Sequence, residues 1–161
     1  MRVDVSQRIA VPRDRVLDAL ADKDWYGSIE SGPGLGAPEP LSLSSVDGVV
    51  RTSVRWRYAG TLPPAAARLL DAEKMTWVIE LRVDRATFAG SVHVVPDHYE
   101  GLLTFDASIA FDEVDGATLE RVSGELTVKV PLFSDAIERA IASGFDQHLR
   151  AEATALEQYV A

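Results

Sequence analysis

The side chain best suited to do chemistry in this sequence is His148, within the stretch GFDQHLRAE at residues 144–152. Histidine gains and loses a proton near neutral pH, so it is a candidate general acid or base. Glu152 follows four residues later, which places both side chains on one face of a helix. Three interpretations stay open: a core histidine hydrogen-bonded to a neighbour such as Glu152, a polar anchor in an apolar ligand pocket, or an acid/base partnered by Tyr58 or Glu152.

The other polar groups lack the spacing that catalysis or metal binding requires. His93 and His98 flank Asp97, but no H-x-H or H-E-x-x-H pattern accompanies them, and a surface turn explains all three. The acidic residues at 112–115 lack the ligand order of a calcium loop. The sequence has no nucleophile elbow, no phosphate-binding motif and no cysteine. It therefore predicts no metal site, no cofactor and no catalytic residue beyond the candidate His148.

The charge balance excludes several classes of partner. With 16 basic and 25 acidic residues the formal net charge is -9, which repels nucleic acid and anionic membranes. The densest positive group, Arg51, Arg55 and Arg57, alternates with apolar residues and is predicted to be the solvated side of a strand. No apolar run reaches the roughly 18 residues of a membrane span, and MRVDVSQRIAVP lacks the apolar region of a signal peptide. We expect no nucleic-acid partner, no membrane span and a cytoplasmic location.

The elements that must position these residues follow from periodicity. A chain of 161 residues suits one domain over 1–161. Alternation of polar and apolar residues predicts a strand at 2–10 and six more between 41 and 130. Asp47-Gly48 and Asp115-Gly116 separate alternating runs and predict hairpin turns, because a type I′ turn needs positive φ at both central residues.

Helical patterns occupy the two ends of the chain. Two short helices are predicted, one beginning after Pro12 and one at 24–30, and the Gly/Pro-rich segment 31–40 is predicted to lack regular structure. After Pro131 the apolar period changes from two to 3.6, which predicts a helix of about 133–160. This helix is the only predicted element long enough to cover one face of the sheet.

Large aromatic side chains lie on the more apolar side of the predicted strands, and that side should face the helix. Core packing explains Trp56, Tyr58 and Trp77 taken singly, but together they could form the wall of a ligand cavity. Gly144 is predicted to leave room between helix and sheet. The predicted ligand-binding residues are Trp56, Tyr58, Trp77, Ile79, Phe105, Ile109, Leu126, Ile141, Phe145 and His148.

The element order resembles a known fold. A strand, two short helices, six strands and a long helix are similar to the helix-grip fold of the START-like and birch-pollen-allergen-like (SRPBCC) superfamily. The segments VPRDRVLDALADKDWY, LSLSSVDGVVRTSVRWRY, TLPPAAARLL and VKVPLFSDAIERAI resemble an uncharacterised, mainly actinobacterial family within it. The resemblance implies an α+β fold, in which a seven-stranded curved antiparallel sheet wraps around the C-terminal helix and encloses an apolar cavity. It carries over no catalytic residues.

Three functions are compatible with these observations. The first is binding of a small hydrophobic ligand (a lipid, a sterol or a polyketide-like molecule) in the cavity between sheet and helix, as the resemblance implies. The alternative is a polyketide cyclase or dehydratase-type enzyme that uses His148. The second alternative is a protein-interaction module or dimer with a packed core. Binding is favoured over catalysis because no catalytic constellation accompanies the histidine, and both monomer and dimer stay open.

Overall fold

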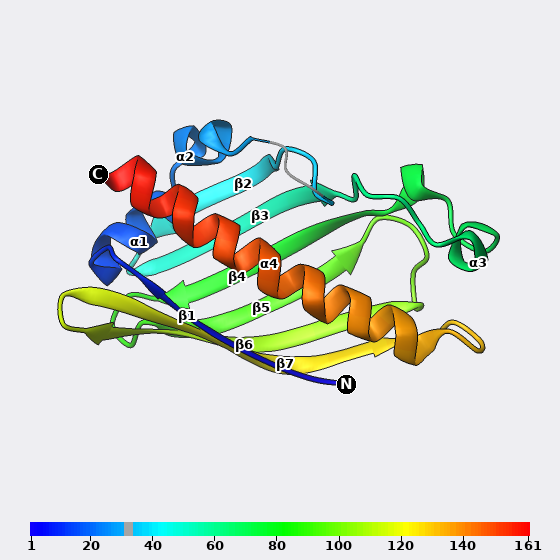
Figure 1. The fold of residues 1–161 in the computed structure, drawn as a ribbon. Coiled ribbons are helices and arrows are strands. Elements are labelled where there is room, and N and C mark those ends of the chain that lie inside the picture. Colours follow the sequence, from blue (N-terminus) through cyan, green and yellow to red (C-terminus); the bar gives the residue numbers. More distant parts are fainter. Residues whose placement is uncertain (31–33) are drawn as a thin grey trace.

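Seven antiparallel strands form one curved sheet in the computed structural model, which describes residues 1–30 and 34–161 (Figure 1). The strands are β1 (Arg2–Ile9), β2 (Glu39–Val46), β3 (Val49–Arg57), β4 (Thr76–Asp84), β5 (Ala89–Pro96), β6 (Leu103–Val114) and β7 (Ala117–Val128). Their spatial order is β1-β7-β6-β5-β4-β3-β2. Consecutive strands from β2 to β7 are therefore neighbours, and β1 pairs with the last strand, so β1 and β2 are the two edges.

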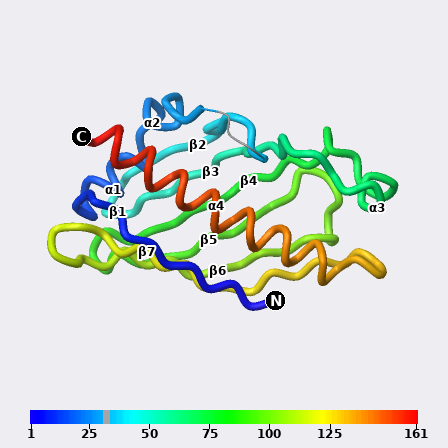
Figure 2. Tube along the Cα trace, viewed as in Figure 1, coloured from blue at the N-terminus to red at the C-terminus, as the bar shows by residue number. Residues whose placement is uncertain are grey.

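Helices lie at both ends of the chain and in one loop. They are α1 (Arg13–Leu20), α2 (Lys23–Ser28), the short α3 (Pro64–Ala67), the 3-10 turn η1 (Ala72–Lys74) and the long α4 (Ser134–Val160). The chain trace shows α4 running diagonally across one face of the sheet, with α1 and α2 near its C-terminal end (Figure 2). The predicted α+β helix-grip fold is confirmed, including the long terminal helix and the two short helices after β1.

Local sequence signals account for most boundaries. Asp47 and Gly48 have φ of 54° and 74°, and Asp115 and Gly116 have φ of 51° and 76°, the positive values that the predicted type I′ turns require. Of the segment predicted to be irregular, residues 31–33 lie outside the described residues and 34–38 form no helix or strand beyond one isolated bridge, while β2 begins at Glu39.

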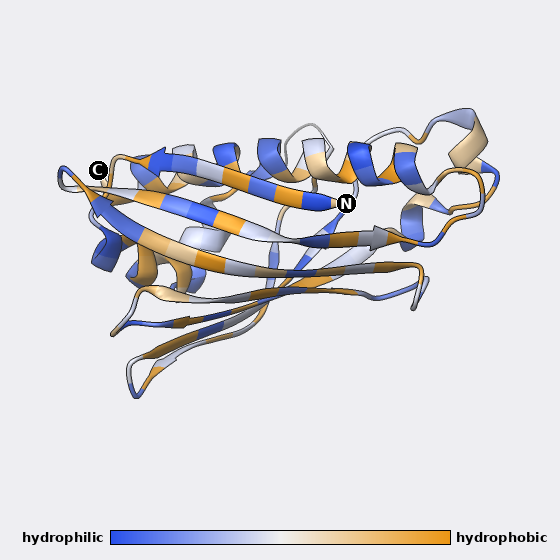
Figure 3. Ribbon diagram, turned by 90° about the horizontal axis from the view of Figure 1, so that it is seen from below, coloured by the Kyte–Doolittle hydropathy of each residue, from blue (hydrophilic) through white to orange (hydrophobic). Residues whose placement is uncertain are grey.

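Hydrophobic and hydrophilic residues alternate along the strands (Figure 3). Because successive side chains of a strand point to opposite faces, the two faces of the sheet differ in polarity. Arg51 and Arg57 are exposed and Arg55 pairs with Asp97 on the outer face, as predicted. The inward side is mostly apolar, as predicted, and it also buries the polar residues Thr52 and Glu120. Its buried residues include Val50, Val54, Trp56, Val83, Val92, Phe105, Ile109, Phe111, Val122, Leu126 and Val128.

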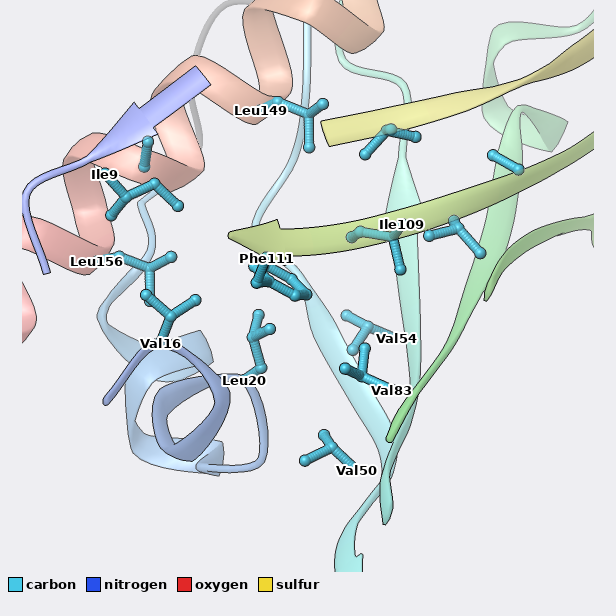
Figure 4. Close-up of a cluster of buried hydrophobic side chains, with 14 of the residues drawn as sticks. Ile9, Val16, Leu20, Val50, Val54, Val83, Ile109, Phe111, Leu149 and Leu156 are labelled. Carbon is cyan, nitrogen blue, oxygen red and sulfur yellow. The ribbon is translucent and has the colours of Figure 1, made fainter. Parts of the chain in front are cut away.

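The helix α4 packs tightly only in its C-terminal half. Its buried residues are Leu149, Ala153 and Leu156. Leu156 lies beside Ile9 and Val16 where β1, α1 and α4 meet (Figure 4). Two polar contacts tether this end: the Glu157 carboxylate accepts the Ala10 N–H at 2.7 Å, and the Tyr159 hydroxyl donates to Asp22 at 2.7 Å.

The N-terminal half of α4 is held less closely. Ile137, Ile141 and Phe145 on its inward side are only partly buried. The Ser134 hydroxyl donates to the Val130 carbonyl at 2.9 Å, and Glu138 accepts the Val128 N–H at 3.0 Å. The interior is therefore closed at one end of α4 and looser at the other.

The expectation for Gly144 is wrong. This residue is exposed, and a Cβ built on it would meet no atom within 4 Å, so Gly144 faces solvent and leaves no room at the sheet.

A Gly144→Ala variant should therefore be more stable than the wild type by about 0.5–1 kcal/mol, because glycine costs that much within a helix. Urea unfolding measures the difference. Gly90→Ala is the contrasting variant, since its Cβ would lie 1.7 Å from the Arg82 carbonyl oxygen and should cost about 1–3 kcal/mol. A destabilised Gly144→Ala variant would contradict the solvent-facing placement.

Candidate functional site

A cavity of about 60 Å³ lies between α4 and the inward face of the sheet. Five polar residues contribute to its wall: Tyr26, Thr52, Glu120, His148 and Glu152. The remaining wall is apolar or aromatic, formed by Leu20, Val54, Trp56, Ile79, Leu81, Val92, Ile109, Phe111, Val122, Phe145 and Leu149. A larger depression between α2 and β2 is open to solvent and is lined by Lys23, Asp24, Gly27, Ser28, Pro38 and Pro40, without buried ionisable groups. The cavity under α4 is therefore the candidate site.

Half of the residues predicted to bind a ligand line this cavity. They are Trp56, Ile79, Ile109, Phe145 and His148. Phe105 and Leu126 are buried in the core instead, and Trp77 and Ile141 are partly buried beside it. Tyr58 lies beyond the end of β3, where its hydroxyl donates to the Thr61 carbonyl at 3.1 Å. The cavity thus brings together the middle of the sheet and α4, and Tyr58 is not among its lining residues.

His148 contacts both an aromatic ring and a carboxyl group. Its imidazole packs edge-on against Trp56 with ring centroids 4.4 Å apart, and its Nε2 lies 3.5 Å from Oε2 of Glu152. Only 11% of the side chain is exposed. Burial lowers the pKa of His148 to about 4, because the charged ring would lose its hydration. At neutral pH the ring is uncharged, so a proton shared with Glu152 resides on the carboxyl group.

Glu120 is the buried acid that sequence reasoning missed. It lies on β7, is 8% exposed and points to the same side of the strand as Val122. Its partner across the ladder is Gln7 on β1, whose Nε2 donates to Glu120 Oε2 at 2.5 Å. Burial raises the pKa of Glu120 to about 7, and the Gln7 hydrogen bond opposes this shift. The sequence pattern places Glu120 in the two-residue phase of Val122 and Leu126, but that phase alone does not show that the carboxyl group is buried.

Glu152 is the second acid of the cavity. Burial is the main cause that raises the pKa of Glu152 to about 8, and the negative charge of Glu120 raises it further. Two carboxyl groups that share one low-dielectric site cannot both ionise easily. The pair therefore retains protons at neutral pH, where exposed glutamates have lost theirs.

Tyr26 and Thr52 complete the polar part of the wall. The buried Tyr26 hydroxyl donates to the Leu20 carbonyl at 2.8 Å. Burial and the charge of Glu152 raise the pKa of Tyr26, so the phenol stays protonated. Among the described residues, no lysine or arginine lines the cavity. Its polar part is acidic and carries no cation.

The remaining groups considered from sequence lie elsewhere. His93 is exposed on the outer face and contacts Asp106, and Asp97 accepts hydrogen bonds from Arg55 and Thr76. In residues 1–30 and 34–161, no three His, Asp or Glu side chains are arranged to hold a metal ion. None of the helices in these ranges combines the length and apolarity needed to cross a bilayer.

Fold and cavity together define a helix-grip protein whose interior space is apolar with one acidic side. Residues 4–160 match the model of a family described as "Protein of unknown function (DUF2505)", and the chain belongs to that family. No curated protein sequence matches this chain.

Several solved structures share the fold. The Zhui aromatase/cyclase from Streptomyces sp. R1128 superposes with a TM-score of 0.67 at 16% identity, covering 100% of this chain and 96% of the cyclase. The protein TTHA0849 from Thermus thermophilus superposes with a TM-score of 0.64 at 14% identity, covering 98% of this chain and 95% of TTHA0849. Ara h 8.0201 superposes with a TM-score of 0.58 at 15% identity, covering 99% of this chain and 97% of Ara h 8.0201. These likenesses, at 14–16% identity, show that the chain shares the helix-grip fold of these structures.

The raised pKa of Glu120 determines how stability should depend on pH. Glu120 holds its proton more tightly in the folded protein than in the unfolded chain. Its contribution to the free energy of unfolding is therefore fully present below about pH 4.5 and is lost as the pH rises through about 7. Glu120→Gln removes this loss. The free energy of unfolding of the variant should equal that of the wild type near pH 5 and exceed it by about 1–3 kcal/mol at pH 8.5.

Denaturant unfolding at the two pH values measures this difference. Glu80→Gln, on an exposed glutamate of the outer face, is the matched control. If Glu120→Gln changes stability equally at both pH values, Glu120 is not a buried acid of raised pKa.

Proposed function

We propose that this protein binds a small, predominantly apolar ligand in the cavity between the sheet and α4. The observation that carries the proposal is the cavity itself, whose apolar and aromatic wall includes a few converging polar groups. This composition is typical of small-molecule sites, where apolar surface supplies affinity and polar groups fix orientation. The likeness to a solved aromatase/cyclase supports a small-molecule use of the fold, although fold alone does not determine function.

The size of the cavity limits the ligand. A volume of about 60 Å³ accommodates roughly four to six water-sized groups, taking about 10–15 Å³ for each. Sites for drug-sized ligands are usually about 300–1,000 Å³. A whole sterol or acyl lipid therefore requires the partly buried N-terminal half of α4 to move outward. A short molecule, or the end of a longer one, fits without that movement.

A second candidate function is the proton chemistry of a cyclase or dehydratase. The observation that favours it is the 3.5 Å contact between His148 and Glu152 at the cavity wall. A general acid works best with a pKa near the operating pH. The pKa of about 8 for Glu152 meets this condition, whereas His148, with a pKa of about 4, is mostly unprotonated. In an enzyme of this kind Glu152 would donate the proton and His148 would orient it.

Filling the cavity tests the binding proposal. Val92 lines the cavity from β5, so Val92→Phe should occupy the space and weaken binding of 1-butanol at least about tenfold while the protein stays folded. The binding is measured from the shift of the Trp56 indole N–H signal in NMR titrations.

Val83→Ala is the control for nonspecific destabilisation, because Val83 is fully buried but does not line the cavity. It should lower stability and leave 1-butanol binding unchanged. Native mass spectrometry with organic extraction of the purified protein then identifies any natural ligand. If the wild type binds no apolar probe at millimolar concentration, the proposed function is wrong.

A further inference from the structure

The acidic side of the cavity is unusual because no lysine or arginine among the described residues lines it. Glu120 is more than nine-tenths buried, and only its Oε2 has a hydrogen-bond partner among the described residues, the amide of Gln7. Glu152 has 18% of its side chain exposed and contacts His148. Buried carboxyl groups are ordinarily paired with a cation or bind a metal ion.

The groups facing the pair from every neighbouring element are neutral or acidic. His148 on α4 is uncharged at neutral pH because its pKa is lowered to about 4. Tyr26 on α2 is a protonated phenol, Thr52 on β3 is a hydroxyl and Gln7 on β1 is an amide. With two acids, an uncharged imidazole and no lysine or arginine among the described lining residues, the site can accept one positive charge without leaving a charge unpaired.

The wall around the pair suits an organic cation better than a metal ion. A divalent metal prefers several oxygen ligands in a regular shell, and the described residues offer no such arrangement. Trp56 and Phe145 contribute aromatic rings to the same cavity, and aromatic faces attract ammonium groups. Carboxylates that bind the charge and rings that contact the carbon atoms together describe a site for an alkyl or aryl ammonium group.

We infer that the ligand of this cavity is a small hydrophobic amine, whose ammonium group pairs with Glu120 and Glu152 while its carbon chain lies against Trp56 and Phe145. This inference rests on the proposed function and names its ligand class. A carboxylate ligand is disfavoured because it would bring a further negative charge to the pair, and a neutral alcohol leaves the pair unchanged.

Binding of an amine should be linked to proton release. The pair retains protons near neutral pH, and an ammonium ion stabilises the ionised carboxylate, so binding displaces a proton. An aliphatic ammonium group, like that of lysine, stays charged up to about pH 9. The affinity for the amine should therefore rise with pH across the range in which Glu120 and Glu152 titrate, about 7 to 8.

The test compares butylamine, 1-butanol and butyrate, which have nearly the same size and differ in charge. Each is titrated into the full chain at pH 6 and pH 8.5, and binding is followed through the Trp56 indole N–H signal. The affinity for butylamine should be at least about tenfold higher at pH 8.5 than at pH 6. 1-Butanol should show no pH dependence, and butyrate should be the weakest of the three.

Two isosteric variants locate the charge. Glu120→Gln and Glu152→Gln should each reduce butylamine affinity at pH 8.5 by at least about tenfold, a larger loss than either causes for 1-butanol. A cooperative urea unfolding transition shows that both variants are folded. Glu80→Gln, exposed on the outer face, should bind butylamine as the wild type does.

The outcomes separate the two proposals. If 1-butanol binds but butylamine gains nothing between pH 6 and pH 8.5, or if butyrate binds best, the amine inference is overturned and the cavity remains a ligand site. If none of the three shifts the Trp56 signal, both the proposed function and the ligand class are wrong.

Discussion

The interior of this protein depends on how one helix covers one face of a wide sheet. Seven strands spaced about 4.8 Å apart span about 29 Å, whereas a helix with its side chains is about 10–12 Å across. Because α4 packs closely against β1, β7 and the two short helices, it cannot also fill the space above the middle strands. Curvature of the sheet and large side chains occupy most of that space, and the cavity is what remains.

The composition of the cavity wall is as informative as its size. An apolar side chain in place of Glu120 or Glu152 would avoid the cost of burying a carboxyl group. A sequence selected for stability alone would therefore favour such replacements, and the two buried acids support the ligand-binding function proposed above. Neutral His148 does not offset their charge, and its contacts with Trp56 and Glu152 fix its place in the wall.

Much of the fold was predictable because it follows from local patterns. The two-residue alternation, the Asp-Gly turns and the change of period after Pro131 define the strands, hairpins and α4 closely.

The site was harder to predict. Tyr58 follows Trp56 by two residues, so the strand alternation predicts that its side chain points inward. However, β3 ends at Arg57, and beyond the strand the alternation no longer determines where a side chain points. Gly144 lies at the margin of the helical stripe, where spacing alone does not separate inside from outside. Glu120 shares the inward phase of β7, yet a single charged residue in an apolar series is identified as buried only when the partner strand, here β1 with Gln7, is known.

The most direct test of this account is the titration of the two buried carboxyl groups. Carbon-13 NMR of the glutamate side-chain carboxyl carbons, assigned with Glu120→Gln and Glu152→Gln, follows each acid separately. Both groups should titrate well above the ordinary range of glutamate, near pH 7 and 8. Replacing Glu120 should lower the pKa of Glu152, because the charge of Glu120 contributes to its shift. Independent titration of both groups near about pH 4 to 5, as for exposed glutamates, would contradict it.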